Sequence, residues 1–306
     1  MASLIDLFIN HMAAEDKQPD TLTQYRGVLQ RFEQWLQQAH SLSLTAADVG
    51  SITGLHLSEY YQTLHSNARA VSTRNNYTTI IKSFFSFLKK THVIRKNPAD
   101  VLRSVKEKGD KSEEDDRSYT AEQLGILLNS LQVEQPTLNN YRDLAIVALI
   151  LGTGLRASEV CGLNVSDAEG IKSGMIRCKR KGGTNEKVYV ASFVYPHVER
   201  YLLMRRKPQP DEPLFTSQKK QRATRNMIWR MLSTKQEKLG LPTGVHILRH
   251  TFLSAVDQTP GGAALARDLA GHSSVSITNT YLHASEAECK EGVNQIGYAP
   301  MLIVTQ

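Results

Sequence analysis

The chain has little cysteine, and its few cysteines form no recognisable pattern. Cys161, Cys178 and Cys289 are the only ones among 306 residues. An odd number at wide spacing argues against a disulfide framework and indicates a reducing compartment. The absence of a Cys-x-x-Cys pair also argues against a cysteine-based zinc site.

Long apolar runs are absent as well. None reaches the roughly 20 residues that a membrane-spanning helix needs. The first ten residues hold a short apolar patch with no basic residue before it, which predicts an amphipathic helix and not a signal peptide. We therefore expect a cytoplasmic protein without a membrane anchor.

The length and the charge of the chain narrow its class further. Its 306 residues exceed the length at which single cores stop growing, so two domains are expected. Lys and Arg number 37 against 30 Asp and Glu, which gives a net charge of +7 and a pI near 9.2. This balance favours a polyanionic partner such as nucleic acid, although a basic surface can also serve solubility alone.

A charged segment divides the chain. Residues 104–118 lose apolar periodicity, contain a glycine and cannot bury a face, so they predict a linker between a domain of residues 1–103 and one of residues 119–306. Apolar residues recur at helical spacing over 22–36 and 77–88, which predicts a helical bundle for the first domain.

Basic residues gather on or beside the second of these helical segments. A helix with such a set can lie against a phosphate backbone, and a solvated helix face is the alternative interpretation. The candidate DNA-binding residues are Arg69, Arg74, Lys82, Lys89 and Lys90, with Arg95 and Lys96 close by.

The second domain is predicted to be mainly helical with a small antiparallel sheet. Thr120 and Gln123 form a capping box, and an apolar segment over 143–151 reads as a helix that ends at two glycines. Strand signals occur only over 175–178 and 187–190, separated by a turn that predicts a hairpin. The fold class is therefore mainly α, with a minor β component.

The two glycines, Gly152 and Gly154, admit two interpretations. The sequence Gly-Thr-Gly-Leu-Arg-Ala fits a relaxed dinucleotide-binding fingerprint, but that motif needs a preceding strand, and the preceding run is long and rich in Ala and Leu. In the second interpretation the glycines end one helix, and Arg156 begins the next with Glu159 on the same face. Arg156 then suits phosphate binding, oriented by Glu159.

Histidines near residue 250 suggest either a metal site or phosphate chemistry. His246 and His250 have the spacing of a metalloprotease pair, but Ile247 occupies the place of the required glutamate, which argues against zinc. His246 and Arg249 share a helix face, an arrangement that suits phosphate binding with proton transfer and equally suits a structural cap.

Further along, the chain carries Gly271-His272 and the run Thr-Asn-Thr-Tyr-Leu-His with Tyr281. A tyrosine near cationic groups suits nucleophilic attack on phosphate, because those groups stabilise both the phenolate and the transition state. An ordinary half-buried tyrosine is the alternative for this residue taken alone.

Taken together, these motifs resemble the catalytic signature of the tyrosine recombinase (phage integrase) family. The matching residues occur in the order Arg156, Lys181, His246, Arg249, His272 and Tyr281. The resemblance spans roughly residues 117–285, and the first domain more weakly resembles the family's core-binding domain. Among members, the compact length most resembles Xer recombinases and short transposon or phage integrases. The implied architecture is a C-shaped clamp around duplex DNA.

The resemblance implies a covalent mechanism without cofactor or metal. Tyr281 attacks a scissile phosphodiester and becomes joined to the 3′-phosphate, releasing a 5′-hydroxyl. Arg156 and Arg249 bind the non-bridging oxygens and Lys181, or alternatively Lys179, protonates the leaving oxygen. His246 is the implied base, His272 hydrogen-bonds the phosphate and Glu159 supports Arg156.

The resemblance also implies a tetramer on two DNA sites, with accessory DNA-bending or activating proteins as further partners. Residues 285–296 are expected to form a helix, followed by an apolar, strand-like end. We expect the segment 285–306 to dock on a neighbouring subunit, with packing against its own domain as the competing arrangement. The rival functions are a type IB topoisomerase and a non-catalytic DNA-binding module.

Overall fold

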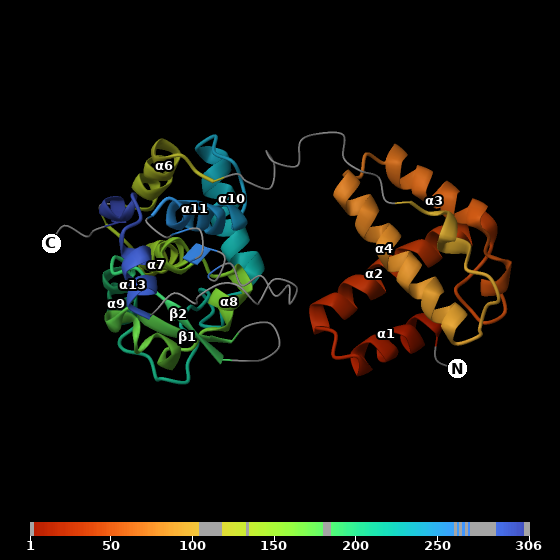
Figure 1. The fold of residues 1–306 in the computed structure, drawn as a ribbon, viewed down its shortest axis with the longest axis horizontal. Coiled ribbons are helices and arrows are strands. Elements are labelled where there is room, and N and C mark those ends of the chain that lie inside the picture. Colours follow the sequence, from red (N-terminus) through yellow and green to blue (C-terminus); the bar gives the residue numbers. More distant parts are fainter. Residues whose placement is uncertain are drawn as a thin grey trace. The chain divides into compact units, whose positions relative to one another are not determined.

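The computed structural model describes residues 3–103, 118–132, 135–179, 185–259 and 286–302, with positions 262, 265, 266 and 269 between the last two ranges. The chain divides into two compact units, Met1–Lys111 and Ser112–Gln306, which we describe separately (Figure 1). This boundary falls inside the segment 104–118 that the sequence marks as a linker. All of that segment except Ser118 lies outside the described residues.

The first unit is a bundle of helices around an aromatic core. Its helices are α1 (Leu4–Ala14), α2 (Pro19–His40), α3 (Gly54–Ser66) and α4 (Val71–Lys90), with 3-10 turns at Val49–Ser51 and Pro98–Val101. The predicted helical segments 22–36 and 77–88 lie within α2 and α4. Phe8, Phe32 and Phe84 are at most 2% exposed, and the rings of Phe8 and Phe84 meet edge to face with centroids 5.5 Å apart. Such pairs add to the burial of apolar area that stabilises the bundle.

The second unit is built around a helix that is buried on all sides. Its helices are α6 (Ala121–Leu131), α7 (Leu138–Thr153), α8 (Ala157–Gly162), α9 (Val194–Met204), α10 (Arg225–Lys238), α11 (His246–Asp257) and α13 (Glu286–Asn294), with 3-10 turns at Ser166–Ala168, Ile171–Ser173 and Ala299–Leu302. Every residue from Ala145 to Leu151 in α7 is fully covered, and α7 packs against α9 and α11. An all-round apolar helix belongs in a domain interior.

A two-stranded antiparallel sheet completes the second unit, in agreement with the predicted fold class. It pairs β1 (Met175–Lys179) with β2 (Asn185–Tyr189), so that Lys179 stands opposite Asn185. The second strand begins two residues earlier than predicted. Its first residues are polar and exposed and therefore give no apolar signal, while the backbone ladder alone defines the strand. Among the described residues, no helix is long and apolar enough to cross a membrane.

The C-terminal segment packs against its own unit as far as residue 302. The Tyr298 hydroxyl donates a hydrogen bond to the Leu151 carbonyl at 2.7 Å, and the Leu302 carbonyl lies 2.8 Å from His197 Nε2. The predicted helix over 285–296 agrees with α13, whereas residues 299–302 of the expected strand-like end form a 3-10 turn. Several side chains of the C-terminal segment are buried within this unit, as the competing arrangement predicts: Cys289, Val293, Ile296, Tyr298 and Leu302. Docking on a neighbouring subunit stays a prediction. Residues 303–306 lie outside the described part.

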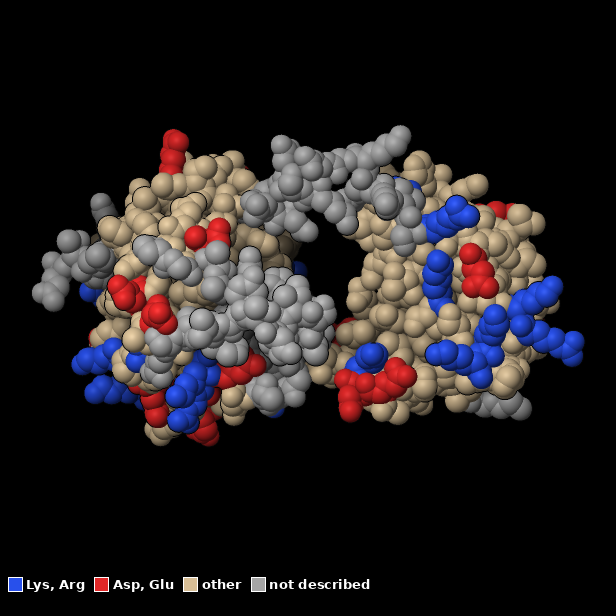
Figure 2. All heavy atoms as spheres, viewed as in Figure 1, with Lys and Arg blue, Asp and Glu red and all other residues tan. Residues whose placement is uncertain are grey.

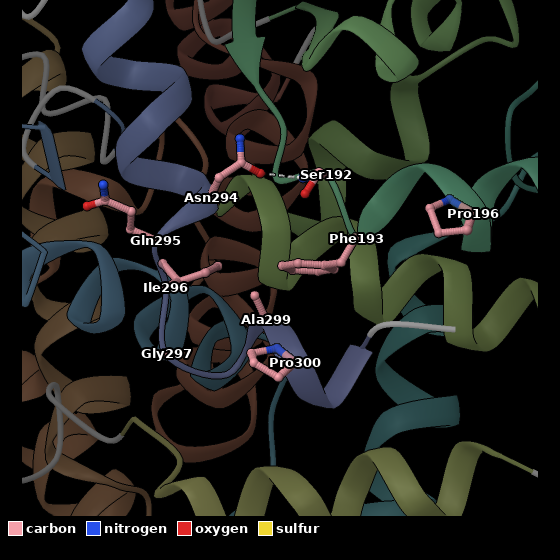
Figure 3. A pocket seen from close by; sticks show the side chains of 9 residues that line it. All are labelled: Ser192, Phe193, Pro196, Asn294, Gln295, Ile296, Gly297, Ala299 and Pro300. Carbon is pink, nitrogen blue, oxygen red and sulfur yellow. Dashed lines mark hydrogen bonds between the residues drawn. The ribbon is translucent and has the colours of Figure 1, made fainter. Parts of the chain in front are cut away.

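A hollow of about 620 Å³ lies along this seam (Figure 3). Phe193 and Pro196 line one side, and Ile296 and Pro300 line the other. The Ser192 amide donates to Asn294 Oδ1 at 2.7 Å, which ties the end of α13 to the start of α9.

Candidate functional site

The turn between α7 and α8 depends on glycine at position 154. Gly154 adopts the left-handed conformation, with φ 65°, and a Cβ there would stand 2.5 Å from Cδ1 of Phe252 in α11. Only glycine permits both this conformation and this close approach. The turn follows a helix and not a strand, so the dinucleotide fingerprint lacks the structural context that it requires.

Arg156 follows this turn and occupies the N-cap position of α8. Its backbone amide donates to Glu159 Oε2 at 2.8 Å, and its Nη1 donates to Glu159 Oε1 at 3.2 Å. The Glu159 side chain is 8% exposed and that of Arg156 is 41% exposed. A nearly buried carboxylate therefore fixes one side of a guanidinium whose other part reaches solvent, which is the arrangement that the spacing predicted.

Helix α11 brings Arg249 to the same turn. Arg249 is 6% exposed, and its Nη1 donates a hydrogen bond to the Gly154 carbonyl. This contact joins two motifs that are 95 residues apart in sequence. Because the Gly154 carbonyl orients the guanidinium of Arg249, the turn and α11 together fix the position of this positive charge.

His246, at the start of α11, lies in the field of both arginines. Loss of hydration lowers its pKa most, and the positive charges of His250, Arg249 and Arg156 lower it further. A lowered pKa keeps the imidazole neutral near pH 7 and able to accept a proton. The structure thus brings together three of the six predicted catalytic residues, Arg156, His246 and Arg249.

The other three predicted catalytic residues, Lys181, His272 and Tyr281, lie outside the described residues. The alternative acid, Lys179, ends β1 and is exposed. It lines a hollow of about 320 Å³ together with Ser158, Glu159 and Asn185. The end of β1 therefore faces the same hollow as the residue that orients Arg156.

The candidate DNA-binding residues of the first unit differ in exposure. Arg69, Lys89 and Lys90 are exposed, and Lys82 is half-buried. Arg74 is only 9% exposed, and its guanidinium carbon lies 5.7 Å from the centre of the Tyr61 ring. Helical spacing places Arg74 on the buried side of α4 with Thr78 and Ile81, so it does not extend outward as the sequence interpretation assumed.

The surroundings of these residues are poor in acidic groups. Residues 60–99 contain no Asp or Glu, although the segment holds all five candidates. On the face seen in Figure 2, Lys and Arg side chains are spread over the first unit with only a few acidic patches. Such a stretch raises the local positive potential.

Sequence reasoning missed Arg222, in the loop before α10. Its Nη1 donates to the carbonyls of Cys161 (3.1 Å), Gly162 (3.1 Å) and Leu163 (2.9 Å), and its Nη2 donates to Asn164 Oδ1 at 2.6 Å. The residue lies about 60 positions from its acceptors and belongs to no motif, so no local signal could have identified it.

Comparison with known proteins gives matches over both units. The family model described as "Phage integrase family" matches residues 117–288, and "Phage integrase, N-terminal SAM-like domain" matches residues 5–92. Tyrosine recombinase XerC of Roseiflexus castenholzii is 30% identical over 293 residues, which cover 92% of this chain and 89% of that protein.

Solved structures share the fold. The Tn1549 transposon integrase in complex with circular intermediate DNA aligns with a TM-score of 0.66 at 21% identity, covering 96% of this chain and all (100%) of that one. A λ integrase tetramer bound to a Holliday junction aligns with a TM-score of 0.67 at 15% identity, covering 91% and 79%.

Proposed function

The chain belongs to the phage integrase family and is a site-specific tyrosine recombinase, and from this premise we propose that Tyr281 is the nucleophile that cuts DNA. The observation that supports this proposal most is the convergence of Arg156, His246 and Arg249 at the Gly154 turn. Two fixed guanidinium groups beside a neutral imidazole can stabilise a phosphorane-like transition state and accept a phenolic proton.

The proposed reaction is a transesterification. The Tyr281 oxygen attacks phosphorus, the bond from phosphorus to the 5′-oxygen breaks, and the chain end remains as a 3′-phosphotyrosine. His246 accepts the phenolic proton, and Lys181 donates a proton to the departing 5′-oxygen, with Lys179 as the alternative donor. A 5′-hydroxyl from a second duplex then reverses the step and exchanges the strands, so no cofactor is needed.

Arg156 and Arg249 bind the non-bridging oxygens, whose negative charge grows as phosphorus becomes five-coordinate. Glu159 orients Arg156, and His272 donates a hydrogen bond to the same phosphate. The buried position of Arg249 strengthens its effect, because the field of a charge is screened less away from water.

We assign DNA binding to residues 1–103 and chemistry to residues 119–306. Arg69, Lys82, Lys89 and Lys90 contact backbone phosphates, supported by the acid-free stretch around them. Arg74 stacks on Tyr61 and stabilises this surface from beneath. A tetramer on two duplexes fits the likeness to the λ integrase tetramer, and the reducing-compartment composition fits action in the cytoplasm.

The test traps the covalent intermediate. Duplexes from the DNA that flanks the protein's own gene, each with a 5′-bridging phosphorothiolate, are incubated with the protein and run on a denaturing gel. We expect an SDS-resistant adduct with wild type and with Tyr298→Phe, and none with Tyr281→Phe. An adduct that persists in Tyr281→Phe refutes the assignment of the nucleophile.

Two further arms separate the rivals and the two lysines. A sulfur leaving group needs no protonation, so the variant that lacks the true acid cleaves the phosphorothiolate but not the ordinary phosphodiester. Lys181→Ala is expected to behave in this way and Lys179→Ala is not. Exchange between two labelled duplexes distinguishes recombination from relaxation of supercoils by a topoisomerase-like activity.

A further inference from the structure

We propose that Arg222 is a positioning residue for cleavage, which holds the C-terminal end of α8 so that Arg156 at the other end meets the scissile phosphate. The inference rests on the proposed role of Arg156. It adds a residue from a distant loop, between α9 and α10, to the machinery that sets the geometry of the site.

Helix α8 is too short to hold its position unaided. It comprises six residues, Ala157–Gly162. Isolated helices shorter than about 12 residues are marginal in water, so most of the order of α8 must come from contacts outside it. A short helix also leaves its last carbonyls without intrahelical donors.

Arg222 supplies donors to those carbonyls. Its Nη1 lies between 2.9 and 3.1 Å from the oxygens of Cys161, Gly162 and Leu163, and its Nη2 lies 2.6 Å from Asn164 Oδ1. A positive charge at a helix C-terminus also complements the helix dipole. One planar guanidinium therefore fixes the end of α8 and the residues that follow it.

The opposite end of α8 is the catalytic one. Arg156 is the N-cap residue, and Glu159, one turn into the helix, bonds both its amide and its guanidinium. Since the helix moves as one body, displacement of its C-terminal end tilts Arg156 and Glu159 together. A misplacement of about 1 Å in a catalytic group can reduce a rate by about a hundredfold.

The experiment separates positioning from DNA binding. It measures single-turnover cleavage of the phosphorothiolate duplex at saturating protein, together with the dissociation constant for DNA and its salt dependence. Arg222→Gln and Arg222→Lys are compared with Arg230→Gln, which removes the same charge from an exposed position of α10.

We expect Arg222→Gln to lower the cleavage rate at saturation by about tenfold to a hundredfold, with the dissociation constant within twofold of wild type. Arg222→Lys should fall in between, because one ammonium cannot reach all four acceptors at once. If Arg222→Gln folds poorly, the cleavage rate of Arg222→Lys tests the proposal instead. Arg230→Gln should cleave at the wild-type rate at saturation.

Two results overturn the proposal. Wild-type cleavage in both Arg222 variants would show that α8 keeps its place without the arginine. Weaker binding with a shallower salt dependence and an unchanged rate at saturation would make Arg222 a phosphate contact instead. Failure of the proposed function is a different result, because wild type would then form no adduct, or Tyr281→Phe would form one as well.

Discussion

Replacement of Gly154 by alanine tests the geometry of the site at its tightest point. Alanine at φ 65° costs about 1–2 kcal/mol, because its Cβ crowds the following carbonyl in the left-handed region. The same Cβ would lie 2.5 Å and 2.8 Å from two ring atoms of Phe252, and overpacking of this kind costs about 1–3 kcal/mol. Alanine restricts the unfolded chain, which offsets about 0.4–1 kcal/mol. The net loss in the free energy of unfolding is therefore about 1–5 kcal/mol.

The strain should also reach the proposed active site. Phe252 is fully buried in the core of the second unit, so its ring has little room to move. The turn must shift instead, and that shift moves the Gly154 carbonyl away from Arg249 and changes the start of α8 at Arg156. We expect the cleavage rate at saturating DNA to fall by at least about tenfold in the fraction that remains folded.

Urea unfolding followed by tryptophan fluorescence measures the stability change. The chain has two tryptophans, Trp35 in the first unit and Trp229 in the second, so a Trp35→Phe background reports the second unit alone. Gly162→Ala is the matched control. A Cβ there meets nothing within 4 Å, and the residue lies in a helix, so that variant should be as stable as wild type or slightly more stable.

A Gly154→Ala protein within about 0.5 kcal/mol of wild type would refute the reasoning, since surface substitutions away from special features usually have effects of this size. A second check is Phe252→Leu combined with Gly154→Ala. If the ring is the obstacle, the double variant loses less stability than the sum of the two single variants.

Two further predictions concern His246 and Tyr298. The pKa of His246 is lowered, so its neutral form persists as the pH falls through the ordinary histidine value near 6.5, and cleavage at subsaturating DNA should decline only below that pH. His246→Gln should abolish this decline of the cleavage rate at low pH. An unchanged decline in the variant would assign it to another group. Tyr298→Phe removes the hydroxyl that donates to the Leu151 carbonyl at 2.7 Å, so the free energy of unfolding in urea should fall by about 1–3 kcal/mol. The variant should still form the covalent adduct with DNA. Unchanged stability would contradict a stabilising role of this hydrogen bond.

The features that the sequence predicted correctly are local ones. The helix that ends at Gly154 and the pairing of Arg156 with Glu159 depend on residues within one helical turn of each other, so spacing alone indicates them. The two helical segments in the first unit follow in the same way from apolar periodicity. The antiparallel pairing of β1 with β2 agrees with the predicted hairpin, but β2 begins two residues and ends one residue earlier than the predicted strand.

The features that the sequence does not predict correctly depend on which face of a helix or segment packs against the core. Arg74 counts as a surface cation by composition, yet the period of α4 turns it inward over Tyr61. The apolar residues from 299 onward predict a strand-like end, but residues 299–302 form a 3-10 turn whose Leu302 is buried within the same unit. Apolar character indicates that a segment is covered and gives no information on which surface covers it.

The turn at the proposed active site is held by hydrogen-bond donors from distant parts of the chain. The Tyr298 hydroxyl donates to the Leu151 carbonyl, 147 residues away in sequence, and Arg249 donates to the Gly154 carbonyl, 95 residues away. Arg222 donates to the carbonyls at the end of α8. A left-handed turn and a six-residue helix have little stability of their own, so the position of Arg156 is a property of the folded unit. Substitutions at these donors should therefore slow cleavage before they weaken DNA binding, since they alter the geometry of the reacting groups and leave the surface cations of the first unit unchanged.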